Sequence, residues 1–311
     1  MAPPLASDLL LVAAGVAGLW LGAEQFVTGA TRLARRLGVS GLVIGLTVVS
    51  FGTSAPEFAV TVDAALTAKA DISVGNVVGS NVVNLGFVLG GTALIRRLPV
   101  ATDLVRRDGA IMVGSVLLLL VVLGDRTVTR VEGAVLVLLL VGYLVVLVRS
   151  DSDDATRRVE TRKFRRTDSL RLVGGLAVVV AAAHALVSGA ASAAAAVGVS
   201  EWVIGVTVVA LGTSTPELVT SVAAAYRGRA NLAAGNVVGS CIFNVFGVLG
   251  LAATLRALPV AGVAVRGTLW LLGMAVVAAA LLWTRRVLSG PEGLALVALN
   301  ALHWAGDLLG W

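Results

Sequence analysis

GTSAPE at residues 52–57 decides the fold, and GTSTPE at residues 212–217 repeats it. Each stretch places a glycine, two hydroxyl side chains, a proline and a glutamate inside a long apolar run. A proline inside a helix lacks the N–H that would bond the carbonyl four residues earlier, and its ring pushes that carbonyl away. The sequence therefore predicts two broken helices, with the breaks set by Gly52, Pro56, Gly212 and Pro216.

The composition is that of a polytopic membrane protein. The chain is 58% hydrophobic and 14% charged, whereas a soluble domain carries roughly 25% charged residues. Cys241 is the only cysteine, so no disulfide can form within the chain. The net charge of +6 is typical of arginine-rich cytoplasmic loops rather than of nucleic-acid binding. We expect the lipid bilayer as the environment, no nucleic-acid partner and no obligate protein partner.

Apolar runs of about 20 residues can cross a bilayer as helices. The chain contains ten candidates, which predict an all-α protein with ten transmembrane helices: 9–31, 41–68, 73–95, 109–124, 130–148, 171–194, 200–226, 231–255, 266–284 and 291–310. The residues before the first run lack a basic segment and a clear cleavage site, so we expect a retained span and not a removed signal peptide.

The basic residues predict the orientation. With ten spans, one set of loops holds 19 of the 24 Lys and Arg residues, including the charged, solvated segment at 149–171. Cytoplasmic loops carry the excess of Lys and Arg, so this set is assigned to the cytoplasm. We expect a multi-pass protein of the plasma membrane, with both termini outside and the 149–170 loop cytoplasmic.

An internal repeat relates the two halves of the chain. Residues 38–100 align with 198–260 at a constant shift of 160, and 33 of the 63 positions are identical. Five spans precede the charged loop, so the second half enters the membrane with opposite polarity. The predicted units are 1–148, the loop 149–170, and 171–311. Inverted repeats suit alternating access around a site at the bilayer midplane. A structural scaffold without transport is the alternative. The identities concentrate on polar residues that a scaffold would not need, and this favours transport.

Two carboxylates lie near the middle of predicted spans, at Glu57 and Glu217. A central carboxylate costs roughly 2.5–3.5 kcal/mol on insertion scales. Equivalent positions of an inverted repeat approach each other near the midplane, where two anions repel unless a proton or cation intervenes. A divalent cation would neutralise both, and the carbonyls that each proline leaves unpaired would add oxygen ligands.

A second motif supplies further oxygens. GNVVGSNVVN at 75–84 and GNVVGSCIFN at 235–244 place polar residues at i, i+4 and i+8, which is one helical stripe. Close packing through the glycines is the structural alternative, above all for Asn76 and Asn236. Hard oxygen donors suit Ca²⁺, Mg²⁺, Mn²⁺ or Na⁺ and argue against Zn²⁺ and Cu⁺. The candidate donors beside the glutamates are Thr53, Ser54, Ser80, Asn84, Thr213, Ser214, Ser240 and Asn244.

With these motifs the sequence resembles the cation/Ca²⁺ exchanger superfamily, and most closely its prokaryotic Na⁺/Ca²⁺ exchanger-like branch. The resemblance covers essentially the whole chain and implies a secondary active antiporter, not an enzyme, that moves Ca²⁺ against Na⁺ or H⁺ by alternating access. No cofactor is implied. It also implies four cation sites, with the two glutamates as shared central ligands, the threonines and asparagines around them, and serines lining the Na⁺ sites.

One departure from that family affects the charge of the site. Many relatives have an acidic residue where this chain has Asn244, so its central site carries at most two negative charges, which balance one Ca²⁺ or two Na⁺. The stoichiometry therefore stays open, as do H⁺ coupling and a K⁺ requirement.

Other functions and positions stay open at this stage. A cation channel could use the same oxygens, and a sensor or scaffold could hold a structural Ca²⁺, whereas hydrolysis at Ser54 or Ser214 lacks a neighbouring base. Glu24 and His184 are equivalent under the shift of 160. The resemblance makes their spans, the first and sixth, a sliding gate. A proton-sensitive gate is one hypothesis for this pair, and a simple polar contact is the alternative.

Overall fold

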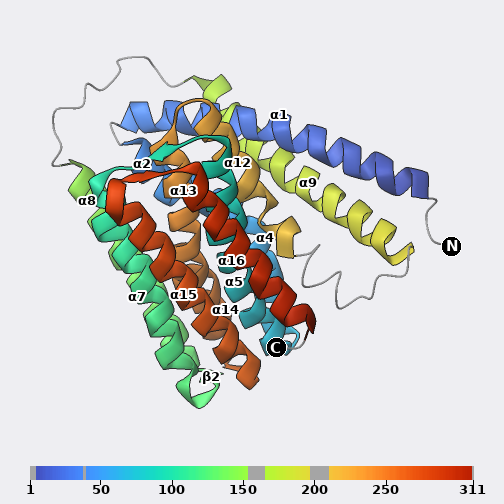
Figure 1. Cartoon of the computed structure of the whole chain (residues 1–311), viewed down its shortest axis with the longest axis vertical. Coiled ribbons are helices and arrows are strands. Elements are labelled where there is room, and N and C mark those ends of the chain that lie inside the picture. Colours follow the sequence, from blue (N-terminus) through green and yellow to red (C-terminus); the bar gives the residue numbers. More distant parts are fainter. Residues whose placement is uncertain (1–4, 38–39, 153–164, 197–209, 310–311) are drawn as a thin grey trace.

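The computed structural model is a bundle of long helices, and it describes residues 5–37, 40–152, 165–196 and 210–309 (Figure 1). The first half contains two broken or widened spans between continuous helices. Its elements are α1 Leu5–Leu37, α2 Gly41–Ile44, the π-helical η1 Gly45–Val49, α3 Ser50–Thr53, α4 Ala55–Leu66, α5 Ala70–Val83, the π-helical η2 Asn84–Gly90, α6 Gly91–Ile95, β1 Leu98–Pro99, the π-helical η3 Leu104–Asp108, α7 Gly109–Val122, the 3₁₀ turn η4 Leu123–Asp125, β2 Thr127–Val128 and α8 Arg130–Ser152.

The described part of the second half follows this order, with the continuous helix α15 in place of η3, α7 and η4. Its elements are α9 Arg166–Ala196, α11 Ala210–Thr213, α12 Thr215–Tyr226, α13 Ala230–Phe243, the π-helical η6 Asn244–Leu249, α14 Gly250–Leu255, β3 Leu258–Pro259, α15 Gly262–Arg285, β4 Val287–Leu288 and α16 Gly290–Leu309. The predicted run at 200–226 is described from Ala210 onward, and its earlier residues lie outside the described part.

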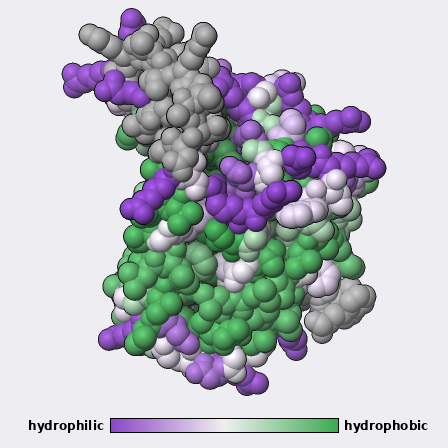
Figure 2. All heavy atoms as spheres, turned by 90° about the vertical axis from the view of Figure 1, so that its left-hand side faces the viewer, coloured by the Kyte–Doolittle hydropathy of each residue, from purple (hydrophilic) through white to green (hydrophobic). Residues whose placement is uncertain are grey.

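Several helices are apolar enough to span a membrane. Six qualify by length and composition, and the bent pair Gly41–Thr53 and Ala55–Leu66 would make a seventh, within the ranges that the structure describes. The predicted run at 109–124, the shortest of the ten, belongs to a longer span at Leu104–Asp125. Figure 2 shows a broad apolar band with hydrophilic side chains gathered at the two ends. The protein is therefore a membrane protein, and the count of ten spans stays a prediction.

The polar motifs lie at the centre of the bundle. The spans Ala70–Ile95 and Ala230–Leu255, which carry the second motif, are 72% and 83% buried over their most apolar windows, more than the other four continuous spans of the described structure. In the second half, small residues allow this burial, because a side chain at Gly235 would meet the carbonyl oxygen of Leu42 at 3.0 Å and one at Gly239 would meet Ser50 Oγ at 2.4 Å. The close packing weighed above for the glycines of the second motif is therefore found at Gly235 and Gly239. The counterpart of α2 and η1 in the second half lies outside the described residues.

Helices α1 and α9 lie side by side, apart from the main axis of the bundle (Figure 1). Glycines bring the two backbones together: a side chain at Gly22 would lie 2.9 Å from the backbone nitrogen of Val179, and one at Gly175 only 2.5 Å from that of Phe26. A larger residue at either position would push the helices apart. The first helices of the two halves therefore form one tightly packed pair.

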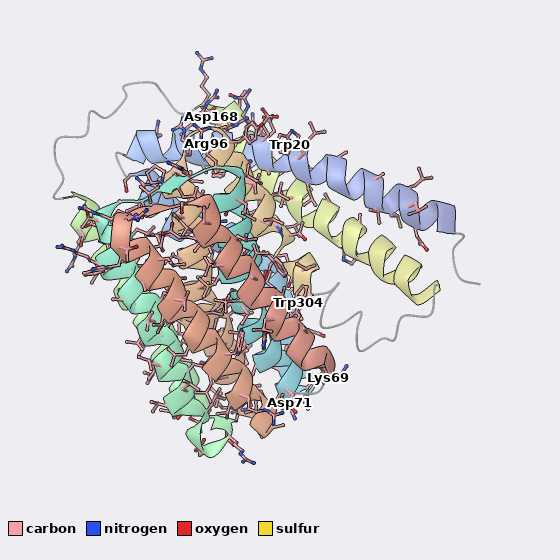
Figure 3. All side chains as sticks on the ribbon, in the orientation of Figure 1. Trp20, Lys69, Asp71, Arg96, Asp168 and Trp304 are labelled. Atoms are coloured by element: carbon pink, nitrogen blue, oxygen red, sulfur yellow. The ribbon has the colours of Figure 1, made fainter. Side chains whose placement is uncertain are left out.

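Two short antiparallel ladders join the halves at opposite ends. Leu98 and Pro99 of β1 pair with Leu288 and Val287 of β4, and β2 pairs with β3 in the same way. Helix α15 connects β3 to β4 and, with 24 residues, is about 36 Å long, so the ladders are separated by the length of a span. The labelled Arg96 and Lys69 lie near these two ends (Figure 3).

Candidate cation site

Each GTS(A/T)PE motif breaks a helix at its serine. Helix α3 ends at Thr53 and α4 begins at Ala55, while Ser54 between them has φ −79° and ψ 11°. The helical segments on the two sides meet at 50°. Ser214 repeats the break between α11 and α12 with φ −86° and ψ 4°. Pro56 and Pro216 occupy the first turns that follow, where a missing N–H is tolerated, so the structure agrees with the predicted breaks.

The two glutamates lie in the first turns of α4 and α12, and both are completely buried. Each is bonded by the serine of the other half. Ser214 Oγ donates to Glu57 Oε1 at 3.2 Å, and Ser54 Oγ donates to Glu217 Oε1 at 2.9 Å. The second oxygen of each carboxylate, Oε2, has no hydrogen-bond partner among the described residues. Two buried carboxylates therefore meet between the broken helices, each with one oxygen unpaired.

Hydroxyl groups from the second motif surround this pair. Ser240 Oγ donates to Glu217 Oε1 at 3.4 Å, and Ser80 Oγ lies 3.5 Å from Thr213 Oγ1. Thr53 Oγ1 donates to Asn236 Oδ1 at 3.2 Å, which again connects the two halves. All of these side chains are buried. The site is thus lined by neutral oxygens around two carboxylates.

Asn84 and Asn244 are buried and are the first residues of the π-helical turns η2 and η6. Such wide turns occur often at functional sites. Neither amide atom of Asn84 has a partner in the described structure, whereas Asn244 Nδ2 donates to Asn81 Oδ1 at 3.0 Å and only its Oδ1 is unpaired. The difference arises because the residue equivalent to Asn81 is Cys241, which has no amide to offer.

Asn76 and Asn236 support the broken helices. Asn76 Nδ2 donates to the carbonyl of Glu57 at 3.2 Å and to Thr61 Oγ1 at 2.9 Å. Asn236 Nδ2 makes the equivalent bonds to the carbonyl of Glu217 at 3.4 Å and to Ser221 Oγ at 3.0 Å. These are hydrogen bonds between neighbouring helices, which is the structural alternative given above for Asn76 and Asn236. They hold the start of α4 against α5 and that of α12 against α13.

The donor set fits a hard cation. Four of the buried oxygens that lack a partner in the described structure belong to predicted binding residues, namely Oε2 of the two glutamates and Oδ1 of Asn84 and Asn244. Leaving a buried carboxylate oxygen without a partner is costly. Carboxylate, amide, hydroxyl and carbonyl oxygens are the ligands that Ca²⁺ accepts in irregular sets of six to eight. The arrangement can therefore bind and neutralise a hard cation. Among the described residues, no Lys or His hydrogen-bonds to either serine.

All ten predicted binding residues are buried, and hydrogen bonds connect the two glutamates to Ser54, Ser214 and Ser240. The predicted break residues flank the two serines at which the helices break. Glu24 and His184 do not belong to this group. Glu24 is half-buried on α1, where Arg227 pairs with its carboxylate and donates to Thr28 Oγ1, and His184 is exposed on α9. Ser50 and Asn81 were not predicted, although Ser50 Oγ bonds the carbonyl of Asn236 at 2.9 Å. Ser50 and Asn81 are not polar positions shared by the repeats, since their equivalents are Ala210 and Cys241. The identity of the repeats therefore does not indicate them.

Three comparisons with known proteins agree on one family. The family described as sodium/calcium exchanger protein matches residues 7–149 and 169–302. A protein named antiporter CaxA, from Alkalimonas amylolytica, is 38% identical over 253 residues, covering 78% of this chain and 79% of its own. The sodium/calcium exchanger MaX1 of Methanosarcina acetivorans is 34% identical over 298 residues, covering 82% and 85%. A structure of the sodium-calcium exchanger NCX_Mj soaked with Na⁺ and Sr²⁺ is 31% identical with a TM-score of 0.86, covering 97% of this chain and 99% of its own.

Proposed function

The chain belongs to the sodium/calcium exchanger protein family, and from that premise we propose that it is a secondary active antiporter that exchanges Ca²⁺ for Na⁺ by alternating access. The family is one of membrane transporters and not of enzymes. The ions are cargo, and the protein supplies their binding site and the change of access. Na⁺ as the coupling ion is the specific part of the proposal; H⁺ is the alternative, with or without a K⁺ requirement.

One observation carries the proposal: two completely buried glutamates from equivalent helix breaks, each with an unpaired carboxylate oxygen. Ca²⁺ between them would cancel both charges, and so would two Na⁺. Because the same two carboxylates cannot bind Ca²⁺ and two Na⁺ at the same time, the two ions would compete for the site. Competition for one charged site is what couples opposite fluxes in an exchanger.

The remaining predicted residues would complete the ligand set. We assign carbonyl and hydroxyl oxygens to the threonines, the central amide oxygens to the asparagines and the flanking Na⁺ positions to the serines. The proposed binding residues are Thr53, Ser54, Glu57, Ser80, Asn84, Thr213, Ser214, Glu217, Ser240 and Asn244. In this scheme the proline breaks let the ends of α3 and α11 present backbone carbonyls toward the ions.

The symmetry of the contacts supports a two-state mechanism. When a residue of the first half contacts a residue of the second, their equivalents, 160 positions away, make the same contact in the reverse direction. The two serine–glutamate bonds and the two ladders are examples. We propose that residues 1–148 and 171–311 are inverted repeats, with the 149–170 loop cytoplasmic and both termini outside. The tightly packed α1 and α9 would be the pair that moves relative to the bundle centre and opens the site to either side.

The test is uptake of radiolabelled Ca²⁺ into proteoliposomes that contain the purified protein. Vesicles loaded with Na⁺, vesicles with an outward H⁺ gradient and vesicles with neither are compared. We expect uptake with the Na⁺ gradient alone, abolished in Glu57→Gln and Glu217→Gln. Glu132→Gln is the matched control, because Glu132 bonds Thr129 within its own helix start and lies outside the site.

The other outcomes separate the alternatives. Uptake driven by H⁺ alone would keep the site and replace the coupling ion. Uptake that requires K⁺ inside with Na⁺ would add K⁺ to the cargo. Flux that dissipates a Ca²⁺ gradient without any counter-ion would contradict antiport and favour a channel. Loss of uptake in Glu132→Gln as well would mean that the glutamine variants report folding rather than ion binding.

A further inference from the structure

A cavity of about 160 Å³ lies at one end of the bundle, away from the cation site. It opens where the end of α15 meets the start of η3 and α7. The end is the one that carries Arg96, since Arg286 directly precedes β4, which pairs with β1. The arginine distribution predicts that this end is cytoplasmic. The cavity is lined by Thr102, Val105, Arg106, Trp283, Thr284 and Arg286.

Two guanidinium groups line this cavity without a carboxylate partner in the described part of the chain. The Arg106 guanidinium lies 5.7 Å from the ring centroid of Trp283, and Arg286 Nη1 donates to Thr102 Oγ1 at 2.7 Å. Asp108, the buried carboxylate nearby, is already used by Arg107 at 2.8 Å and by Tyr143 Oη at 3.2 Å.

The hydroxyl of Thr102 accepts from Arg286, so its own hydrogen can be donated to a ligand. Asp103 on the same turn is exposed and does not line the cavity. The cavity therefore presents positive charge and hydrogen-bond donors, with an aromatic ring beside them.

The internal repeat provides a comparison within the same molecule. At the shift of 160, the arginines have counterparts in Arg266 and Arg126, at the other end of the bundle. There Gly262 replaces Thr102, Gly124 replaces Thr284 and Leu123 replaces Trp283. Duplication alone accounts for arginines at both ends. It does not account for the hydroxyl groups and the indole, which accompany them at the Arg106 end alone.

The chemistry of the cavity indicates a phosphate at the membrane surface. Trp283 is 59% exposed near the end of a membrane span, where tryptophan lies at the headgroup level. Arginine pairs bind phosphate oxygens through several parallel hydrogen bonds. The volume is below the roughly 300 Å³ at which sites for drug-sized ligands begin, which suits a headgroup rather than a peptide. Basic pockets between helices on the cytoplasmic side are suited to anionic lipid headgroups.

We propose that Arg106 and Arg286, with Thr102 and Trp283, bind the phosphate of an anionic phospholipid in the leaflet at this end. The lipid would bridge the start of α7 and the end of α15, one from each half of the chain. Its acyl chains would lie along the exposed apolar side chains of α15, among them Val276 and Val277.

The test measures lipid binding by the full-length protein in detergent, without an ion gradient. Native mass spectrometry counts bound phosphatidylglycerol, with phosphatidylcholine as the neutral lipid. We expect preferential retention of phosphatidylglycerol and an affinity about thirtyfold lower in Arg106→Gln/Arg286→Gln, from the loss of two surface charges. Arg126→Gln/Arg266→Gln is the matched control and should bind as the wild type does. Thr102→Val, a smaller change, should also weaken binding if the double variant does not fold.

Several outcomes would overturn the proposal. Equal losses in the two double arginine variants would mean nonspecific attraction to positive charge. Unchanged binding in Thr102→Val and in the Arg106/Arg286 variant would place the lipid elsewhere. Full displacement of the lipid by millimolar inorganic phosphate would make the cavity a site for a free anion. Because no transport is measured, failure here leaves the exchange proposal intact, and failure of exchange leaves this one intact.

Discussion

Ser54 and Ser214 each serve the carboxylate of the opposite half, at 2.9 Å from Glu217 and 3.2 Å from Glu57. We expect Ser54→Ala or Ser214→Ala to lower the apparent Ca²⁺ affinity by about tenfold, because a hydrogen bond to a charged group contributes about 1.5–3 kcal/mol. The measurement is the Ca²⁺ dependence of uptake. Thr254→Val is the control, since within the described residues that hydroxyl bonds the carbonyl of Gly250 in its own helix and lies outside the site. An unchanged affinity in both serine variants would contradict this role.

At the residue scale the sequence predicts the site well where the repeats agree and poorly where they differ. Identical polar positions in both halves single out the glutamates, serines, threonines and asparagines that the structure gathers. Asn81 escapes this reasoning because its counterpart is Cys241. Yet Asn81 Oδ1 accepts from Asn244 and its Nδ2 donates to the carbonyl of Cys241 at 3.1 Å. The partner of a side chain across the bundle cannot be read from a linear sequence.

At the scale of elements, the proline breaks have a direct test. A proline in a helix interior costs about 3 kcal/mol, so Pro56→Ala and Pro216→Ala should favour a continuous helix through the break. We expect exchange to fall at least tenfold while the melting temperature is unchanged or higher. Pro291→Ala is the matched control, because that proline also follows the first residue of its helix, α16, but is preceded by strand β4 and not by a helix that could become continuous with it. Normal exchange in both site variants would show that the breaks do not depend on proline.

The contact between α1 and α9 has a pH dependence at its Arg32 end. The backbone N–H of Arg165 and then the Arg32 guanidinium hold the pKa of Asp168 below its usual value of 3.8. The depressed pKa means that the contact stabilises the fold above about pH 4 and that this stabilisation is lost as the pH falls through the folded-state pKa.

We therefore expect Asp168→Asn to lower the melting temperature by a few degrees at neutral pH, and we expect its difference from the wild type to shrink as the pH falls below 3.8. Melting curves of both proteins between pH 3 and pH 8 measure the difference. A difference that persists unchanged at pH 3 would contradict the charge argument. The corresponding contact at the other end of the pair, Ser192 Oγ to Asp8 Oδ2 at 2.9 Å, has no cation.

Apolar runs locate helices better than they locate irregular turns. The continuous runs at 130–148 and 266–284 correspond to α8 and α15 with ends within four residues. The π-helical turns at Asn84 and Asn244 leave no signal in hydropathy, since an extra residue per turn does not change the composition. Likewise, η3 begins five residues before the predicted 109–124 run. The charged residues there lower the mean hydropathy and hide the start of the span: Asp103, Arg106, Arg107 and Asp108. Asp108 is nevertheless buried, because Arg107 and Tyr143 donate hydrogen bonds to its carboxylate.

At the scale of the whole molecule, the halves should depend on each other to fold. Every two-residue ladder joins one half to the other, and Arg96 and Arg256 each donate to a backbone carbonyl of the opposite half, at 2.7 and 3.0 Å. We expect residues 1–160 or 161–311 expressed alone to be degraded. Co-expression of the two pieces should restore exchange, because the cut lies in the charged loop and removes none of the contacts described above.

Membrane abundance and Ca²⁺ uptake of the split protein measure this expectation. A stable, monodisperse first half on its own would contradict it. The internal repeat predicts that the two halves pack against each other. It does not predict the ladders, because the sequence LPV at 98–100 and 258–260 is typical of a loop after a helix. Their partners, β2 and β4, lie outside the 63 aligned positions.

The reciprocal serine–glutamate bonds have a consequence for the origin of the protein. When residue i of one copy contacts residue j of another and the reverse contact also forms, the two copies are related by an isologous two-fold axis, the usual symmetry of a homodimer. The contacts between the halves have this form. We infer that the ancestor had about the length of one half and worked as a homodimer whose two copies made the contacts that now join the halves. Gene fusion would then have turned an interface between two identical chains into contacts within one chain, after which Asn81 and Cys241 were free to diverge.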